Sequence, residues 1–424
     1  MSRFSKPAEG SWTQHYPELG TAPVSYEDSI SPRFYDLERE AIFTRTWLNV
    51  GRVERLPKTG SYFTRELAVA GTSLIVVRGR DGQIRAFHNM CRHRGNKLVW
   101  NDFPGEETAG TCRQFTCKYH AWRYGLDGAL TFIQQEKEFF GIDKSQYGLK
   151  AVRCEIWEGF IFVNLDPQAM PLADYLGDMA KGVEGYPFHE MTEVFSYRAE
   201  VGSNWKLFID AFAEFYHAPV LHQGQYTKEE AAKIMKYGFE ALYYELASPH
   251  GMISTWGGQA PPVDMSMVKP MDQVLRSGLF GPWDKPEVIA NLDQLPPGVN
   301  PKKVKQWGID SWHFYPNFML LIWEPGWFLT YHYWPTAVDK HIFECTLYFV
   351  PPRNARERLA HELAAVTFKE YALQDSNTLE ATQTMIGTKV VKDFPLCDQE
   401  ILLRHLHKVT GDYVKEYANN GASR

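Results

Sequence analysis

Two short stretches, each with one cysteine and one histidine, constrain the fold of this chain more than any other feature of its sequence. Cys91 stands two positions before His93, Cys117 stands three positions before His120, and 23 residues separate the two pairs. Thiolate and imidazole are both good ligands for zinc and for iron. Two distant pairs can share one metal centre only if two loops meet, so the sequence predicts a module whose loop tips enclose an inorganic centre.

Three kinds of centre are compatible with these two pairs. Zinc accepts two thiolates and two imidazoles in a tetrahedron. The Cys112-x4-Cys117 spacing suggests a plant-type ferredoxin cluster, which would need a further cysteine where His120 stands. A Rieske cluster has two cysteines on one iron and two histidines on the other, and it is favoured because each stretch supplies one ligand of each kind. Tyr119 and Trp122 are placed to cover such a cluster from solvent.

The composition favours a soluble globular enzyme. The chain has 424 residues, of which 44% are hydrophobic and 23% are charged, and these are ordinary values for such a protein. A net charge of −6 argues against nucleic acid as a partner. Residues 1–10 contain no apolar leader, and apolar runs such as 319–323 are too short to cross a membrane. Six cysteines suit metal ligation in a reducing cytoplasm better than a disulfide framework, so we expect a cytoplasmic protein without a membrane partner.

We expect a small all-β module (50–165), a larger second domain (166–424) and an N-terminal segment (1–49) that packs on this second domain. Residues 34–48 are amphipathic and follow the Ser31-Pro32 start signal, so they are predicted to be helical. The module consists of short apolar runs broken by glycines. Its expected strands are 73–78, 84–88 and 159–164, with turns at Asp81-Gly82 and Asp127-Gly128.

The second domain combines helical and strand-like patterns. Residues 203–222 and 355–386 are predicted as helices, and residues 261–301, rich in Pro and Met, as a loop that covers a site. The remaining strand-like stretches are 239–260 and 311–350, the latter with strands 318–323, 327–334 and 341–350 and a turn at Glu324-Pro-Gly326.

A second candidate metal site lies in the predicted helix 203–222. Asp210, Glu214 and His217 fall on one face of a regular helix. His217 and His222 are five positions apart, a rotation of about 140°, so a regular helix could not present both imidazoles to one ion. Pro219 lies between them and is expected to distort the helix and bring them together. Two histidines and a distant carboxylate would form the facial triad of non-haem Fe(II) oxygenases.

These residues resemble the motifs of one family. Cys91-Arg-His-Arg-Gly95 and Cys117-Lys-Tyr-His-Ala-Trp122 are similar to the Rieske motifs of the ring-hydroxylating oxygenase α subunits. The resemblance continues through Asn204–His222, with His217 and His222 at the iron-ligand positions. It implies that Asp375 is the third ligand. The linker between the two Rieske motifs is longer than is usual in the family, and Cys112 within it matches no family ligand.

The resemblance also bears on the neighbouring acids. Glu370 and Glu380 are weaker rivals of Asp375 for the ligand position. Asp210 and Glu214 are the candidate catalytic carboxylates. Glu214 stands where most members have an aspartate that bridges the iron histidine to a Rieske histidine of the neighbouring subunit. Some members that act on quaternary amines carry glutamate there.

The resemblance implies an α+β fold: a small all-β Rieske module and a helix-grip catalytic domain, in which an antiparallel sheet packs on a long helix. It implies a Rieske-type 2Fe-2S cluster, a mononuclear Fe(II) and a homotrimer, with or without a small β subunit. The implied reaction activates O2 and hydroxylates a small organic substrate. Because no G-x-G-x-x-G motif follows a strand, we expect a separate NAD(P)H-dependent reductase, with or without a ferredoxin. Basic residues that could dock an acidic electron donor are Arg92, Arg94, Lys97, Arg113, Lys118 and Arg123.

The substrate remains open between two classes. An aromatic compound that is cis-dihydroxylated is the first choice, and a quaternary amine that is hydroxylated or demethylated is the alternative. Four tryptophans could form a cation–π cage for such an amine, namely Trp312, Trp323, Trp327 and Trp334. Two other functions are weighed beside the oxygenase: a Rieske electron carrier without catalysis, and a zinc protein.

Overall fold

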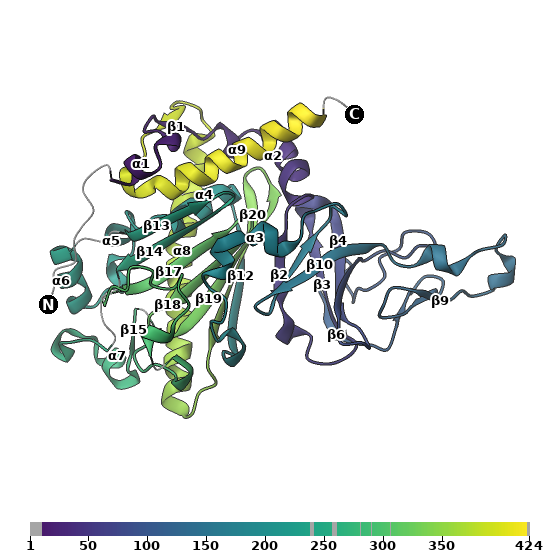
Figure 1. The fold of residues 1–424 in the computed structure, drawn as a ribbon, viewed down its shortest axis with the longest axis horizontal. Helices are drawn as coiled ribbons and strands as arrows, with labels where there is room; N and C mark the ends of the chain where they lie inside the picture. The colour runs from purple at the N-terminus through teal and green to yellow at the C-terminus, as the bar shows by residue number, and fades with distance from the viewer. Residues whose placement is uncertain are drawn as a thin grey trace. The chain divides into compact units, whose positions relative to one another are not determined.

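The computed structural model describes residues 11–237, 241–256, 261–279, 281–289, 291–305 and 307–421. The chain forms two compact units (Figure 1). The β unit consists of residues 39–175, and the α+β unit consists of the chain up to residue 38 together with residues 176–424. Within the described ranges, every helix is too short or too polar to span a lipid bilayer.

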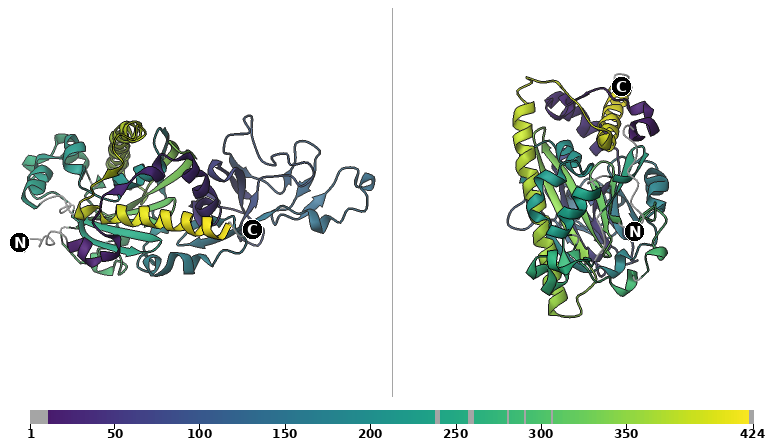
Figure 2. Two further views of the ribbon diagram at one scale, coloured as in Figure 1. Left: turned by 90° about the horizontal axis from the view of Figure 1, so that it is seen from above. Right: turned by 90° about the vertical axis from the view of Figure 1, so that its left-hand side faces the viewer.

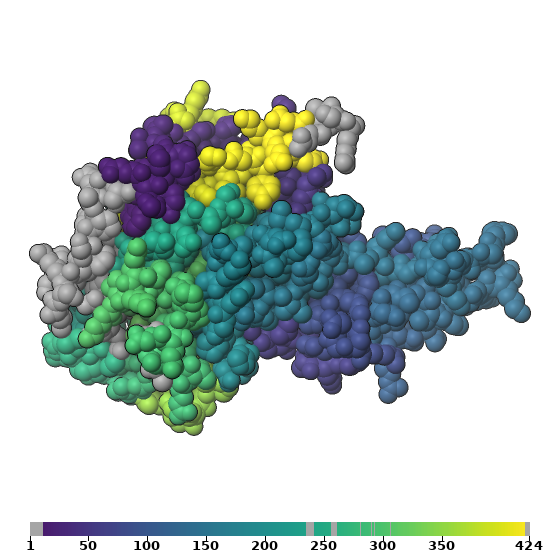
Figure 3. Space-filling model, in the orientation of Figure 1, coloured from purple at the N-terminus to yellow at the C-terminus, as the bar shows by residue number. Residues whose placement is uncertain are grey.

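The β unit contains a seven-stranded antiparallel sheet and a smaller three-stranded sheet. The strand order in the larger sheet is β2-β11-β10-β5-β4-β3-β6. The three-stranded sheet and the turns after it extend away from the larger sheet (Figures 1 and 3). The strand bounds are β2 (Leu48–Arg52), β3 (Ser61–Leu67), β4 (Thr72–Arg78), β5 (Ile84–His88), β6 (Ala109–Thr111), β7 (Phe115–Thr116), β8 (Arg123–Tyr124), β9 (Leu130–Phe132), β10 (Ala151–Trp157) and β11 (Phe160–Asn164).

The sequence predicted the strands of this unit well and its first helix only in part. The runs 73–78, 84–88 and 159–164 correspond to β4, β5 and β11, and the turn at Gly82 has a positive φ of 81°. The predicted helix 34–48 is wrong in its second half: α2 (Pro32–Glu38) ends in a π turn at residues 39–43, and β2 begins at Leu48. β2 pairs with β11 and is almost wholly buried, so sheet pairing overrides the local helical pattern.

The α+β unit is built on a seven-stranded antiparallel sheet with the order β12-β20-β19-β18-β17-β14-β13. Every residue of β17 and β18 is buried, which explains the continuous apolar run of β18, whereas β17 also buries Asp310, Ser311 and His313. The predicted hairpin around Glu324-Pro-Gly326 and the third strand are present. The bounds are β12 (Glu193–Val201), β13 (Ala241–Ala247), β14 (His250–Trp256), β17 (Trp307–Phe314), β18 (Phe318–Trp323), β19 (Trp327–Ala337) and β20 (Lys340–Phe349).

Helices cover this sheet. The long helix α8 (Ala355–Ile386) has the bounds that the sequence predicted and lies along the sheet (Figure 2), where Tyr197 of β12 donates its hydroxyl to the Phe368 carbonyl. The C-terminal helix α9 (Ile401–Gly421), which the sequence analysis did not predict, packs beside the N-terminal segment (Figure 1). The other helices are α1 (Ser11–His15), α3 (Leu172–Lys181), α4 (Trp205–Phe212), α5 (Ala218–Leu221), α6 (Lys228–Tyr237) and α7 (Pro270–Leu275).

Two predicted stretches differ from expectation. Residues 239–260 form the hairpin β13–β14, but positions 239, 240 and 257–260 lie outside the described residues. Residues 261–301 are not a bare loop. They contain α7 and a small hairpin of β15 (Ser277–Gly278) and β16 (Gly281–Pro282), while positions 280 and 290 lie outside the described residues. These results confirm the α+β fold class, an all-β module with an antiparallel sheet and a long helix.

Candidate metal centres

The two Cys/His loops of the β unit have the same hydrogen-bonded shape. In the first loop, the N–H of Gly95 donates to the carbonyl of Cys91 at 3.0 Å, and the N–H of Cys91 donates to Asn96. In the second, the N–H of Ala121 donates to the carbonyl of Cys117 at 3.0 Å, and the N–H of Cys117 donates to Trp122. Gly95 and Ala121 both have positive φ, 73° and 57°, so each loop closes through one left-handed residue. Two like loops therefore each present a thiol and an imidazole.

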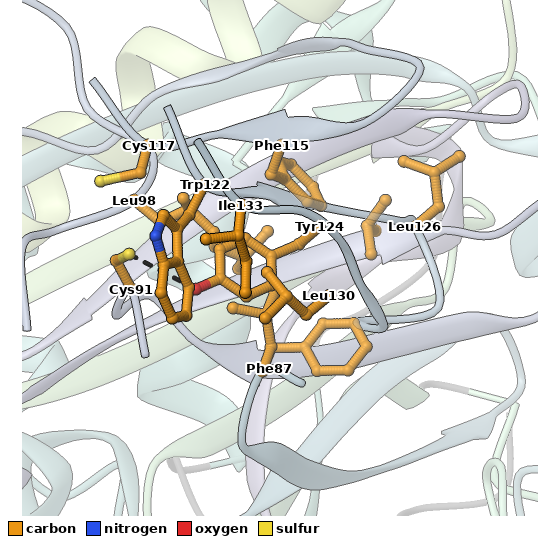
Figure 4. Packing of buried hydrophobic residues seen from close by; sticks show 13 residues of the cluster. Phe87, Cys91, Leu98, Phe115, Cys117, Trp122, Tyr124, Leu126, Leu130 and Ile133 are labelled. Atoms are coloured by element: carbon orange, nitrogen blue, oxygen red, sulfur yellow. Dashed lines mark hydrogen bonds between the residues drawn. The ribbon is translucent and has the colours of Figure 1, made fainter. Parts of the chain in front are cut away.

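The cysteines of these loops lie at one end of the unit's hydrophobic cluster (Figure 4). Both are buried free thiols. The Sγ of Cys91 lies 3.4 Å from the hydroxyl of Tyr124, which also accepts the N–H of Arg92. Burial raises the pKa of the Cys91 thiol, so binding of a metal by its thiolate would release a proton.

The two histidines lie next to each other. The rings of His93 and His120 are 4.6 Å apart, and Trp122 stacks on His93 at 4.9 Å. The Nδ1 atom of His93 is buried and has no hydrogen-bond partner within the described part of the chain. A metal would satisfy this nitrogen, so the donor set fits a Rieske cluster. Trp122 is buried as expected, whereas Tyr119 lies on His120 but is 55% exposed, so its cover is partial.

The structure brings the three predicted ligands of the mononuclear site together. His217, His222 and Asp375 each offer a ligand atom, and these atoms all lie within 4.8 Å of one another. The two Nε2 atoms are 3.2 Å apart, and Asp375 Oδ1 lies 3.7 Å from His217 Nε2 and 3.4 Å from His222 Nε2. Both carboxylate oxygens of Asp375 are buried without a hydrogen-bond partner among the described residues. An unpaired buried carboxylate is costly, and a divalent cation would remove that cost.

The chain brings the two histidines together by a route that differs from the predicted one. Helix α4 ends at Phe212, so Glu214 and His217 do not share a regular helix with Asp210, and that prediction is wrong. His217 is the N-cap and His222 the C-cap of the one-turn helix α5, and Pro219 lies in its first turn. Proline is well tolerated in a first turn, so Pro219 need not kink α5; the two histidines flank this single turn, and the chain leaves the helix at His222.

Each histidine has its Nδ1 atom held by a different residue. His217 Nδ1 lies 2.5 Å from Glu214 Oε1, and the His217 N–H donates to Glu214 Oε2 at 3.1 Å. Burial alone lowers the pKa of His217, but the hydrogen bond and charge of Glu214 outweigh it, so this pKa is raised. His222 Nδ1 lies 2.7 Å from Gln374 Oε1, a contact that the sequence analysis missed because a single glutamine on a helix carries no signal. Both Nε2 atoms are thereby left facing the shared space.

The other candidate acids lie elsewhere. Glu380 accepts the N–H of Gly202 at 2.8 Å, and Glu370 is exposed. Asp210 Oδ2 accepts from His407 Nε2 at 3.0 Å, and His407 Nδ1 donates to Asp28 at 2.8 Å. Asp210 therefore belongs to a buried charge cluster beneath the site. Asp210 also lines a second cavity, together with Glu214 and His217.

An apolar cavity lies against the three metal ligands. Its described lining contains no Lys or Arg, and its only carboxylates are Glu214 and Asp375. Trp323 is the one tryptophan of the proposed cage in this lining, and Trp327 stacks behind it at 5.0 Å. The remaining ring and aliphatic side chains of the wall are Phe212, Phe215, Tyr226, Leu279, Ile309, Leu321, Tyr331, Phe368 and Tyr371.

Comparison with protein families matches two stretches of the chain. Residues 188–416 match the ring hydroxylating alpha subunit (catalytic domain), and residues 46–151 match the Rieske 2Fe-2S domain. The chain therefore belongs to the family of ring-hydroxylating oxygenase α subunits. The cofactors of this family are a Rieske-type 2Fe-2S cluster and a mononuclear iron, and the two donor sets described above suit them.

Similar proteins include components of monooxygenases and of dioxygenases. The carnitine monooxygenase oxygenase subunit of Escherichia coli (strain K12) is 35% identical over 204 residues, covering 46% of this chain and 52% of that protein. The large oxygenase component of a 2,4-dinitrotoluene dioxygenase system from Burkholderia sp. (strain RASC) is 38% identical over 200 residues, covering 44% of this chain and 43% of that protein. The chain thus spans about half the length of the curated relatives that it matches.

Solved structures share the fold over almost the whole chain. A quaternary ammonium Rieske monooxygenase superposes with a TM-score of 0.73 at 17% identity, covering 97% of this chain and 99% of that chain. Naphthalene 1,2-dioxygenase from Rhodococcus sp., bound to indole, superposes with a TM-score of 0.69 at 20% identity, covering 92% and 94%. At these identities the likeness supports the fold alone.

Proposed function

We propose that this chain is the terminal oxygenase component of a Rieske non-haem iron oxygenase system. Cys91, His93, Cys117 and His120 would hold the cluster, and His217, His222 and Asp375 would hold the iron. The observation that carries this proposal is the convergence of two Nε2 atoms and an unpaired, buried carboxylate within 4.8 Å. When bound, the iron supplies a site for O2 activation and the cluster supplies single electrons.

The protein side chains have three tasks in this proposal. Glu214 orients His217 through its contact with Nδ1, and by resemblance to the family it also offers the path by which electrons arrive from a neighbouring subunit. The apolar wall excludes water and holds the substrate beside the metal ligands. A cis-dihydroxylation consumes one O2, two electrons and two protons, so a separate reductase must supply the electrons.

The substrate class that the cavity favours is a small, uncharged aromatic compound. Rings of Phe, Tyr and Trp dominate the wall and suit another ring. The relatives named for carnitine suggest the alternative, a quaternary amine held against Trp323 and the nearby tyrosines. Carnitine also carries a carboxylate, and the described lining offers no cation to pair with it. For this reason we place the neutral aromatic compound first and the quaternary amine second.

The test is substrate-dependent oxygen consumption by the full chain with a surrogate reductase and NADH. A panel should pair neutral aromatic compounds with aromatic acids and with quaternary amines, and mass analysis should identify the products. Oxygen uptake and a doubly hydroxylated product only with the neutral aromatic compounds would support the first choice. Demethylation of an amine would support the alternative. A red-brown protein that is reduced but never consumes oxygen with any substrate would instead favour an electron carrier, and a colourless protein without acid-labile sulfide would favour a zinc protein.

The basic residues around the cluster loops suggest where an acidic electron donor docks. Lys97 is paired with Glu66 at 2.5 Å, and Lys118 donates to the Trp100 carbonyl at 2.6 Å, so these two lysines are already engaged. Arg94 and Arg123 are exposed, and Arg92 is partly so. We expect Arg92→Ala to slow cluster reduction at low salt and to matter less at high salt. Unchanged reduction rates at normal cluster content would contradict docking at this position.

A further inference from the structure

The two imidazoles of the proposed iron site are held by chemically different partners. His217 is oriented by Glu214, a carboxylate three residues before it in the same segment. His222 is oriented by Gln374, an uncharged amide that lies 152 residues later, on α8. The orientation of His217 is therefore a local property of the chain, whereas the orientation of His222 exists only when α8 is docked.

Three residues of helix α8 contact the His222 ring. Tyr371 meets the ring edge-on with the centroids 4.5 Å apart, and Gln374 Oε1 lies 2.7 Å from Nδ1. Asp375 Oδ1 lies 3.4 Å from Nε2 on the opposite side of the ring. These three residues lie within one helical turn. If the His222 ring rotated about the bond that joins it to its Cβ atom, the contacts of Nδ1 and Nε2 would both be lost.

The amide oxygen of Gln374 also selects one tautomer of His222. A carbonyl oxygen can only accept, so Nδ1 must carry the proton and Nε2 keeps its lone pair. That lone pair then points into the space shared with His217 Nε2 and Asp375. A histidine that binds a metal ordinarily donates its other N–H to such a partner, and loss of the partner typically costs 10–100-fold in affinity.

We propose that Gln374 is a positioning residue of the iron site, which fixes the ring and the tautomer of His222 from α8. This inference rests on the proposed function, because it assumes that His217, His222 and Asp375 bind a metal. Gln374 acts only through His222.

The test measures metal binding without turnover. The full chain is depleted of mononuclear iron with a mild chelator, its cluster content is verified by absorbance, and Co(II) is titrated anaerobically by calorimetry. Gln374→Leu removes the acceptor, and Gln374→Glu keeps the acceptor but adds a charge. Asn377→Leu is the matched control, because Asn377 is an exposed amide on the same helix. A thermal melt of each variant reports whether α8 stays docked.

Gln374→Leu should bind Co(II) about 10–100-fold more weakly than the wild type. Asn377→Leu should bind it equally well, and Gln374→Glu should recover most of the loss. Wild-type affinity in Gln374→Leu would overturn the proposal, as would a folded Gln374→Glu variant that binds as weakly as Gln374→Leu. Failure of the wild type itself to bind Co(II) would overturn the metal site, and the proposed function with it.

Discussion

The surroundings of Asp375 are the strongest structural evidence for the proposed metal site. Its side chain is 1% exposed, and neither carboxylate oxygen has a partner among the described residues, although two imidazole nitrogens lie within 4 Å. A carboxylate buried in this way is stable only next to a positive charge. The burial of both oxygens of Asp375 beside two imidazole nitrogens therefore fits a bound cation.

Replacing Asp375 should therefore empty the mononuclear site and leave the cluster intact. Asp375→Asn keeps the size of the side chain and removes the anionic ligand. We expect iron to fall from about three to about two atoms per chain, with acid-labile sulfide unchanged. Metal and sulfide analysis measures both quantities. Glu370→Gln, an exposed acid on the same helix, is the control and should keep all of its iron; full iron content in Asp375→Asn would refute the assignment.

Glu214 should affect electron arrival more than iron content. Glu214→Gln preserves a contact with His217 Nδ1 but removes the charge next to it. We expect reoxidation of the reduced cluster, in the presence of substrate and O2, to slow by about 10–100-fold while iron is retained. Stopped-flow absorbance of the cluster follows this step. Glu380→Gln removes a carboxylate that is bonded to Gly202 instead, so a similar slowing there would show that the effect is not specific to Glu214.

The residues that sequence reasoning could find are those that stand in pairs. The short spacing within each pair indicates a metal site: Cys91 with His93, Cys117 with His120, and His217 with His222. Asp375 is one acid among several on α8, and only the family resemblance singled it out. Gln374 and His407 could not be found at all, because their partners lie 152 and 197 positions away in the sequence. Such contacts are set by the packing of helices, which no local pattern records.

Among the secondary-structure elements, those whose ends carry local signals were predicted best. Helix α8 begins where the Asn354 side chain accepts the N–H of Glu357, and Pro351 and Pro352 come just before this N-cap. The start of the helix can therefore be predicted from the sequence. Helix α9 was not predicted because its buried face carries Arg404, His405 and His407. Each of these polar side chains finds a distant acceptor, as His405 does at the His250 carbonyl.

The position of Pro219 inside α5 leads to a test of how the histidines are brought together. Because Pro219 sits in the first turn of α5, Pro219→Ala should cost only about 0.4–1 kcal/mol of stability, mainly by freeing the unfolded chain. Iron content and Co(II) affinity should stay as in the wild type. Chemical unfolding and metal analysis measure these outcomes. Loss of iron in this variant would restore the earlier explanation, in which the proline itself creates the site.

Three distant parts of the α+β unit meet at His407. The residue lies on α9, Asp28 lies in the N-terminal segment, and Asp210 lies on α4, whose Lys206 is also paired with Glu38 at 2.5 Å. Burial alone would lower the pKa of His407, but the charges of Asp28 and Asp210 raise it to about 10. The same contact, against an opposing effect of burial, lowers the pKa of Asp28 to about 2. His407 is thus a fixed cation that joins the two ends of the chain to the helix before the iron site.

This arrangement predicts a particular dependence of stability on pH. The unfolded pKa of His407 is about 6.5, so its contribution is fully present below that pH and is lost as the pH rises through about 10. The contribution of Asp28 is present above its ordinary pKa and is lost as the pH falls through about 2. His407→Gln removes the cation that contacts both buried carboxylates, so it should cost about 3–5 kcal/mol near pH 6. The difference in unfolding free energy between wild type and variant should shrink steadily from pH 7 to pH 10, as measured by urea unfolding.

His189→Gln, an exposed histidine, is the control. A difference that stays constant over this range would mean that His407 is not held as a cation, and that the N-terminal segment, α4 and α9 are joined by packing alone.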